Sequence, residues 1–233
     1  MVVNTAMSTK ATGIIMTDLK SMIRLQTWLS PAFPIGAFSY SGGLEAAIDE
    51  GYVCDAKSLT TWLTDILEDG TVWNDAVLLA EAWRCAADKE ALNELVLLAQ
   101  AMSFSSERYL ETMDQGSAFL LASKTWHQDD LLPQKCPIPI AIGVLTARMD
   151  VALEDTLAAS LHAVLSNQIQ AALRLMKLGQ QGGLDVLASL ENNILQTAAR
   201  AANATLDDLG SCAAIADIAS MKHETMQSRI FRS

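Results

Sequence analysis

The sequence has few aromatic residues and few charged residues. Aromatic residues make up 6% of the 233 positions and charged residues 18%, whereas hydrophobic residues make up 51%. The apolar content therefore comes mainly from Ala, Leu, Ile, Val and Met, of which Ala, Leu and Met lose little conformational freedom in a helix. The shortage of aromatic residues argues against a strand-rich fold. The composition predicts an all-α protein, and the low charge favours an oligomer or a partner-binding surface.

Sequence features of secreted and membrane proteins are also missing. No apolar run approaches the ~18 residues that a membrane-spanning helix needs, and the N-terminus lacks the layout of a signal peptide. The four cysteines are far apart and form no CxxC pair, which is typical of reduced thiols in a cytosolic protein. We therefore expect a cytoplasmic protein with no membrane partner, in which residues 1–16 are a loosely ordered leader.

Positive charge is scarce, with 16 Lys and Arg residues against 27 Asp and Glu residues and a net charge of −11. Affinity for nucleic acids rests on Lys and Arg neutralising phosphates. The charge balance therefore predicts no general nucleic-acid binding. A partner-binding surface can still be basic locally on an acidic chain.

The sequence contains none of the short motifs that carry common enzyme chemistry. GxxxxGK[ST], GxGxxG after a strand, GxSxG and HExxH are all absent. The three histidines, His127, His162 and His223, stand at no metal-ligand spacing from one another or from a cysteine. We predict a protein that is not an enzyme and has no cofactor, catalytic residue or metal site. A helical enzyme with scattered polar residues, for example around His127 and Glu111, stays open as the alternative.

Hydrophobic periodicity predicts a series of amphipathic helices. The clearest begins after Asp55, a residue suited to cap a helix, and ends at Gly70. Gly116 is expected inside a later helix, where it costs about 1 kcal/mol against Ala unless another segment packs close to it. The same spacing recurs in residues 73–83, 92–102, 106–124, from 140 onward, 153–178, 184–202 and 212–221.

Two interruptions divide this helical pattern. Three prolines in residues 126–139 predict a loop within one domain, and Gly182 and Gly183 predict a break before the helix at 184–202. We expect a single-domain helical bundle of about 8–11 helices over residues 17–221. A tail at residues 222–233 follows it.

An uncharged segment precedes the first clear helix and runs from Ser30 to Leu44. Pro31 and Pro34 cannot both lie inside a regular helix, and three glycines here permit backbone angles closed to other residues. One interpretation is a hydrophobic connection in which Ser39 or Ser41 caps the second helix. The other is an apolar loop buried against the core or against a partner.

Two basic segments lie later in the chain. At the end of the predicted helix 153–178, Arg174 and Lys177 suit the negative end of the helix dipole, and Gly179 suits the position after the helix. The tail has a side-chain charge of +2 on a chain whose net charge is −11, and it contains the apolar pair Ile230 and Phe231. A basic, partly apolar tail on an acidic body favours docking.

Together, these three segments closely resemble the UreF family of urease accessory proteins. The family pattern Ser-Pro-x-x-Pro-x-Gly-x-Phe-Ser-Tyr-Ser followed by Gly-Leu-Glu is met over residues 30–45. The Arg-Leu and Leu-Gly-Gln pattern is met at 174–175 and 178–180, and the terminal His-Glu-Thr and Ser-Arg-hydrophobic-Phe-Arg-Ser pattern at 223–233. The matches follow the family order across nearly the whole chain.

The chain departs from the family pattern at a few positions, where the side-chain roles stay open. The family usually has Gln at Gly42, Pro at Lys177, a second Gln at Leu184, and Gln-Tyr at Met226 and Gln227.

The resemblance implies an all-α homodimer that binds the accessory protein UreD, also called UreH, and recruits the GTPase UreG for nickel insertion into the urease apoprotein. Regulation of GTP hydrolysis by UreG is an open further role, and an independent nickel-binding metallochaperone is a second alternative. Carried over, the resemblance assigns partner-binding or interface-shaping roles to Pro31, Pro34, Gly36, Phe38, Ser39, Tyr40, Gly43, Glu45, Arg174, Lys177, Gly179, Gln180, His223, Glu224, Arg229, Phe231, Arg232 and Ser233.

Overall fold

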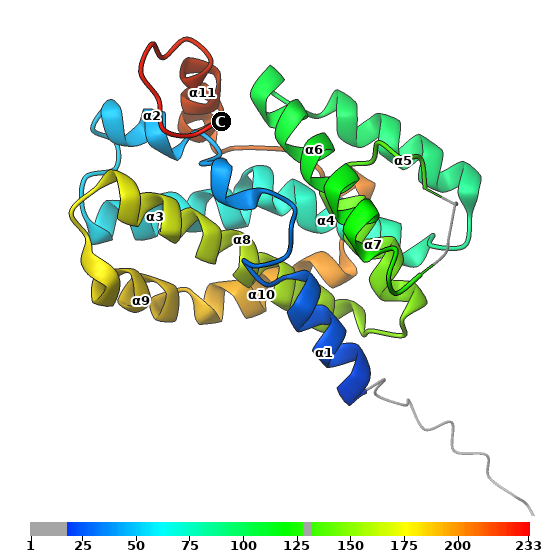
Figure 1. The fold of residues 1–233 in the computed structure, drawn as a ribbon. Helices are drawn as coiled ribbons and strands as arrows, with labels where there is room; N and C mark the ends of the chain where they lie inside the picture. The colour runs from blue at the N-terminus through cyan, green and yellow to red at the C-terminus, as the bar shows by residue number, and fades with distance from the viewer. Residues whose placement is uncertain (1–17, 128–131) are drawn as a thin grey trace, which may run out of the picture.

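The computed structural model describes residues 18–127 and 132–233, and this part of the chain is an all-α bundle without strands (Figure 1). The predicted fold class is therefore confirmed. The predicted leader, residues 1–16, lies outside the described residues. The helices are α1 (Leu19–Trp28), η1 (Ala37–Ser39, a 3₁₀ helix), α2 (Leu44–Asp49), α3 (Ala56–Asp69), α4 (Thr71–Arg84), α5 (Lys89–Ala101), α6 (Ser106–Ser123), α7 (Ile138–Arg148), α8 (Leu153–Leu175), α9 (Gly179–Ser189), α10 (Glu191–Asn203), η2 (Leu206–Asp208, a 3₁₀ helix) and α11 (Ala214–His223).

Helix α3 begins and ends where the sequence predicts. The Asp55 carboxylate accepts a hydrogen bond from the Ser58 main-chain N–H at 2.7 Å, and the Ser58 hydroxyl oxygen accepts one from the Asp55 main-chain N–H at 3.0 Å. These contacts satisfy main-chain N–H groups that have no partner within the first turn. The buried face of α3 carries Leu59, Trp62, Leu63, Ile66 and Leu67.

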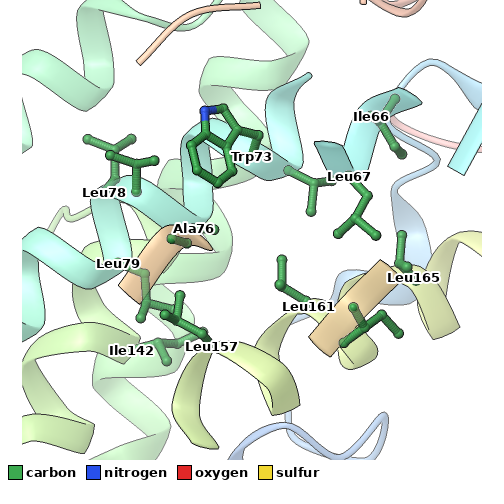
Figure 2. Packing of buried hydrophobic residues seen from close by; sticks show 14 of the residues in the cluster. Ile66, Leu67, Trp73, Ala76, Leu78, Leu79, Ile142, Leu157, Leu161 and Leu165 are labelled. Atoms are coloured by element: carbon green, nitrogen blue, oxygen red, sulfur yellow. The ribbon is translucent and has the colours of Figure 1, made fainter. Parts of the chain in front are cut away.

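The apolar core lies around α4, which packs against α3, α7, α8 and α10. Figure 2 shows Leu67 from α3 facing Leu161 and Leu165 from α8. Leu67 and Leu165 are fully buried. Within the described ranges, no helix combines the length and the hydropathy needed to cross a bilayer.

A close packing contact explains the glycine inside α6. A Cβ atom at Gly116 would collide with the main-chain oxygen of Cys136 and the main-chain nitrogen of Ile138. The end of the proline-containing connection therefore crosses α6 at this position, and α7 begins directly after it. All four cysteines, Cys54, Cys85, Cys136 and Cys212, are free thiols.

The predicted break at Gly182 and Gly183 is wrong, because both residues lie inside α9. A Cβ atom at Gly183 would lie only 3.1 Å from the Ile169 side chain, so a small residue here allows α9 to pack closely against α8. The chain instead breaks at Leu190, between α9 and α10. Gly179 also differs from its prediction, since α8 ends at Leu175 and Gly179 begins α9.

The uncharged segment after α1 combines both interpretations drawn from its sequence. Phe33 is buried against Phe119, with the ring centroids 5.6 Å apart, whereas Phe38 is 69% exposed. Ser41 Oγ accepts a hydrogen bond from the Glu45 N–H at 3.3 Å and so supports the start of α2. The segment turns through Gly36, whose φ of 75° is strained for residues with a side chain.

Candidate partner-binding site

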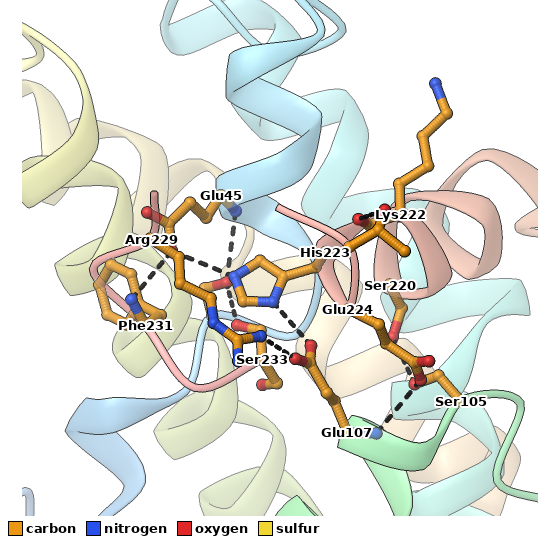
Figure 3. A network of polar contacts seen from close by, with 12 residues as sticks. Glu45, Ser105, Glu107, Ser220, Lys222, His223, Glu224, Arg229, Phe231 and Ser233 are labelled. Carbon is orange, nitrogen blue, oxygen red and sulfur yellow. Dashed lines mark hydrogen bonds and ion pairs between the residues drawn. The ribbon is translucent and has the colours of Figure 1, made fainter. Parts of the chain in front are cut away.

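The C-terminal tail, residues 222–233, folds back onto its own chain. His223, Phe231 and Ser233 are 0%, 3% and 1% exposed. The tail lies against the 30–45 segment, the first turns of α6 and the end of α8 (Figures 1 and 3). We call the residues of these three elements that contact it the tail cradle. The three segments singled out in the sequence therefore meet in one place.

Two carboxylates from different helices hold His223 at the end of α11. Its Nδ1 lies 2.6 Å from Glu107 Oε2 of α6, and its Nε2 lies 3.1 Å from Glu45 Oε2 of α2 (Figure 3). Both ring nitrogens therefore face a carboxylate oxygen, and the His223 side chain is fully buried between them. The contact links α2, α6 and α11 through a buried polar cluster.

Glu45 also binds the main chain of the tail. Its carboxylate accepts hydrogen bonds from the Ile230 N–H at 2.7 Å and the Phe231 N–H at 2.9 Å. Burial opposes ionisation of Glu45, but these N–H groups and His223 outweigh it and hold its pKa below the usual value. Glu45 is therefore the residue that joins the tail to α11 and α2 at once.

Two further tail residues contact the start of α6. Arg229 pairs with Glu107, and Glu224 Oε1 accepts hydrogen bonds from the Ser106 N–H at 2.6 Å and the Ser106 hydroxyl at 2.8 Å. Unpaired N–H groups and the helix dipole favour a carboxylate at a helix N-terminus. The Ser106 hydroxyl, followed by the N–H groups of Ser106 and Glu107, lowers the pKa of Glu224.

Ser233 lies at the centre of the tail cradle. Its main-chain oxygen accepts hydrogen bonds from the Ser41 N–H, at 2.8 Å, and from the Ser41 hydroxyl. Its own hydroxyl donates to Glu111 at 3.1 Å and accepts from the Gly42 N–H at 3.3 Å. One step earlier, the Arg232 N–H donates to the Ser39 main-chain oxygen at 2.8 Å. The main chain of Arg232 and Ser233 is therefore hydrogen-bonded to the 30–45 segment.

Arg174, near the end of α8, joins the second sequence motif to the other two. Its guanidinium lies 4.3 Å from the centre of the buried Phe231 ring, and its Nη1 donates to the Phe38 main-chain oxygen at 3.0 Å. An Arg over an aromatic ring is stabilised by the ring's negative face. Arg174 therefore fixes both the tail and the η1 turn.

Tyr40 and Arg232 form a second aromatic contact. The Arg232 guanidinium lies 5.7 Å from the centre of the Tyr40 ring, and its Nη1 donates to the Tyr40 hydroxyl at 3.4 Å. Burial raises the pKa of Tyr40. The Tyr40 hydroxyl in turn donates to Asp114 of α6 at 3.4 Å.

The outer side of this assembly is apolar and basic. Phe38 is 69% exposed and Ile230 is 60% exposed, and the main chain of each is held by a hydrogen bond, from Arg174 to the Phe38 oxygen and from the Ile230 N–H to Glu45. Arg229 and Arg232 are exposed beside Ile230 along the tail. Exposed apolar side chains on an ordered backbone, flanked by Arg, are typical of a protein-binding surface.

Several residues predicted for the site lie outside these contacts. Pro31 and Pro34 are exposed in the 30–45 segment, and Lys177, Gly179 and Gln180 are exposed between α8 and the first turn of α9. In the described part of the chain, neither Lys177 nor Gln180 makes a side-chain hydrogen bond or ion pair with the tail. Gly43 is buried, and a Cβ atom there would lie 2.8 Å from the Ser220 main-chain nitrogen of α11.

The site residues predicted from the sequence do not include three residues of the tail cradle, Ser41, Glu107 and Glu111. They also omit Asn167 of α8, whose Nδ2 donates to the Ala37 main-chain oxygen of the η1 turn at 3.0 Å. Glu107 and Glu111 lie one helical turn apart on α6, which is a pattern that exposed helices also show. Only burial distinguishes them, since each is 8% exposed.

Among the described residues, no group of three or more His, Cys, Asp or Glu could hold a metal ion. Glu111 contacts Gln115, Ser233 and Arg108, whereas His127 Nε2 lies 2.9 Å from Ser123 Oγ. The two residues considered for an enzyme therefore belong to different contact networks.

The chain is similar to known proteins over nearly its whole length. The UreF family model matches residues 53–191. The chain is 50% identical over 219 residues to the urease accessory protein UreF of Agrobacterium fabrum, covering 93% of this chain and 98% of that protein. It is 48% identical over 223 residues to UreF of Mesorhizobium japonicum, covering 94% and 100%, and 49% identical over 215 residues to UreF 1 of Brucella canis, covering 91% and 94%. This chain belongs to the UreF family.

Proposed function

We propose that this chain is a non-catalytic adaptor in urease maturation. It binds a UreD/UreH-type accessory protein and recruits a UreG-type GTPase, so that nickel is inserted into the urease apoprotein. The relatives are named urease accessory proteins, and these names support a role in urease maturation. The proposal extends to a homodimer in the cytoplasm whose body is residues 17–221 and whose partner-docking tail is residues 222–233.

The observation that carries the adaptor role is the surface formed by the tail and the η1 turn. Glu45, Arg174 and Ser41 hold the backbone of this surface, while Phe38 and Ile230 remain exposed. Because the backbone is already ordered, binding costs less conformational entropy than binding by a loose tail. The basic residues favour an acidic partner surface with apolar pockets.

Co-expression tests this role. The full chain is produced with the UreD-type protein, the UreG-type GTPase and urease of the same organism, and urease activity is assayed with and without it. We expect activity above the background only when the chain is present. Equal activity without it would contradict the adaptor role.

Deletion of Arg229 to Ser233 tests the part played by the tail. We expect the shortened chain to stay folded, because the core around α4 does not include these residues apart from Phe231. It should lose co-purification with the UreD-type protein. A melting curve separates loss of binding from loss of folding, and unchanged co-purification would exclude the tail as a docking element.

A further inference from the structure

A chain of polar contacts runs from α4 to the last residue of the tail. Asp75 of α4 pairs with Arg108 of α6, and Arg108 Nη1 lies 3.6 Å from Glu111 Oε2, three positions further along α6. The same Glu111 oxygen accepts the hydrogen bond from the Ser233 hydroxyl at 3.1 Å. The Arg108 guanidinium and the Ser233 hydroxyl therefore contact one carboxylate oxygen from two sides of the chain of contacts.

The shape of the Arg108 side chain suits this bridge. Its Nη2 donates to Asp75 and its Nη1 faces Glu111, so one planar group contacts carboxylates on two helices. A lysine ammonium carries the same charge at a single nitrogen and lacks this fixed fork of donors. The Arg108 and Glu111 side chains are only 17% and 10% exposed, so water screens this pair less than a surface pair.

Glu111 depends on Arg108 for compensation of its charge. Burial raises the pKa of Glu111, and the Arg108 charge is the largest of the effects that oppose this rise. The other groups that face Glu111 are the negative Asp75, the Ser233 hydroxyl and the neutral Gln115 amide, which donates at 3.2 Å. In the described part of the chain, no second cation forms an ion pair with Glu111.

We propose that Arg108 is a positioning residue of the docking surface. It holds the Glu111 carboxylate where the Ser233 hydroxyl meets it, and this hydrogen bond is stronger for being made to a charged acceptor. Ser233 in turn accepts the Ser41 N–H, so the end of the tail stays against the 30–45 segment. The value of this position for partner binding rests on the proposed adaptor role, whereas the position itself is a property of the isolated chain.

Amide exchange of the isolated full chain, followed by NMR, tests the proposal. The Ser41 N–H donates to the Ser233 main-chain oxygen. The Arg232 N–H donates to the Ser39 main-chain oxygen, so these two amides report whether the end of the tail is held. In Arg108→Lys we expect their protection to fall about fivefold, the size expected for one weakened hydrogen bond.

Arg84→Lys is the matched control. Arg84 pairs with Glu81 at 3.0 Å and at the same three-residue spacing, but both side chains are 31% exposed and lie away from the tail contacts. Protection of the tail amides should therefore stay at the wild-type level in this variant. A melting curve shows whether Arg108→Lys is folded, and Glu111→Gln takes its place with the same expected loss if it is not.

A second substitution separates positioning from general support of the fold. Ser233→Ala removes the hydroxyl through which Glu111 acts on the tail. If Arg108 works through this contact, Arg108→Lys should cause no further loss of protection at Ser41 and Arg232 in the Ser233→Ala background. A merely structural role of Arg108 predicts losses that add.

Two results would overturn the proposal. Wild-type protection of Ser41 and Arg232 in folded Arg108→Lys would show that Arg108 does not position the tail. Additive losses in the double variant would show that Arg108 supports the fold without acting through Ser233. Because no partner is present, neither result bears on the adaptor role, which the co-expression assay tests separately.

Discussion

The apolar core and the tail cradle are built from different kinds of contact. The core around α4 consists mainly of aliphatic side chains from successive helices, with a few aromatic rings. The tail cradle consists of charged and main-chain groups from distant segments, such as Ser41 and Ser233, which lie 192 positions apart. Burial of apolar area stabilises the whole fold, whereas buried charges cost free energy unless each is paired. We therefore expect the core to determine stability and the cradle to determine where the tail lies.

Truncating a core leucine should have the largest effect on stability. Leu67 is fully buried in α3 and lies beside α8 in Figure 2. Leu67→Ala removes apolar contacts and leaves a cavity, so we expect the free energy of unfolding to fall by about 2–5 kcal/mol. Urea denaturation measures this loss, and amide exchange should increase across all helices. Faster amide exchange confined to the tail would contradict the expectation that the core determines the stability of the whole fold.

Neutralising Glu45 should have a smaller and more local effect. Glu45→Gln leaves a weaker acceptor for the Ile230 and Phe231 N–H groups and removes one carboxylate beside His223. We expect a loss of about 1–3 kcal/mol, with faster amide exchange concentrated in residues 229–233. Hydrogen exchange with mass spectrometry localises the change.

Glu50→Gln is the matched control for Glu45→Gln. Glu50 lies five positions further along and pairs with Lys222 at 2.8 Å, but both side chains are more than 40% exposed. An exposed pair is screened by solvent, so amide exchange of the tail should stay near the wild-type rate. Equal amide exchange of the tail in the two variants would show that burial of Glu45 does not determine how firmly the tail is held.

The contribution of Glu45 should depend on pH with a defined sign. Its pKa in the folded protein lies below the usual value, so its stabilisation is complete above about pH 5. As the pH falls through the folded pKa, the carboxylate takes up a proton and the stabilisation is lost. The stability difference between wild type and Glu45→Gln, from urea denaturation, should therefore shrink below about pH 4. A difference that grows with acidification would contradict this assignment.

The sequence predicts the core better than the tail cradle for a physical reason. The boundaries of α3 follow from Asp55 and Gly70, which act within a few residues of their own positions. Gly183 misled the prediction because its small size serves packing against Ile169, a contact that local periodicity does not contain. The break at Leu190 carries no comparable sequence signal.

The candidate site shows the same limit. The three motifs identified Glu45, Arg174, His223 and Phe231, and the structure brings these residues together. Nothing in the sequence shows that His223 faces Glu45 and Glu107, because these residues lie 178 and 116 positions away. Family motifs indicated which segments matter, and only the fold shows which side chain meets which.

Affinity for the UreD-type partner is the most direct test of the central claim, that the tail and the η1 turn form one docking surface. The double variant Phe38→Ala with Ile230→Ala is compared with Leu97→Ala with Leu195→Ala, which truncates similarly exposed side chains on α5 and α10. We expect both variants to melt near the wild-type temperature. The first should bind at least tenfold more weakly by calorimetry or interferometry, and the second should bind like wild type. Equal affinity of the two double variants would contradict the claim.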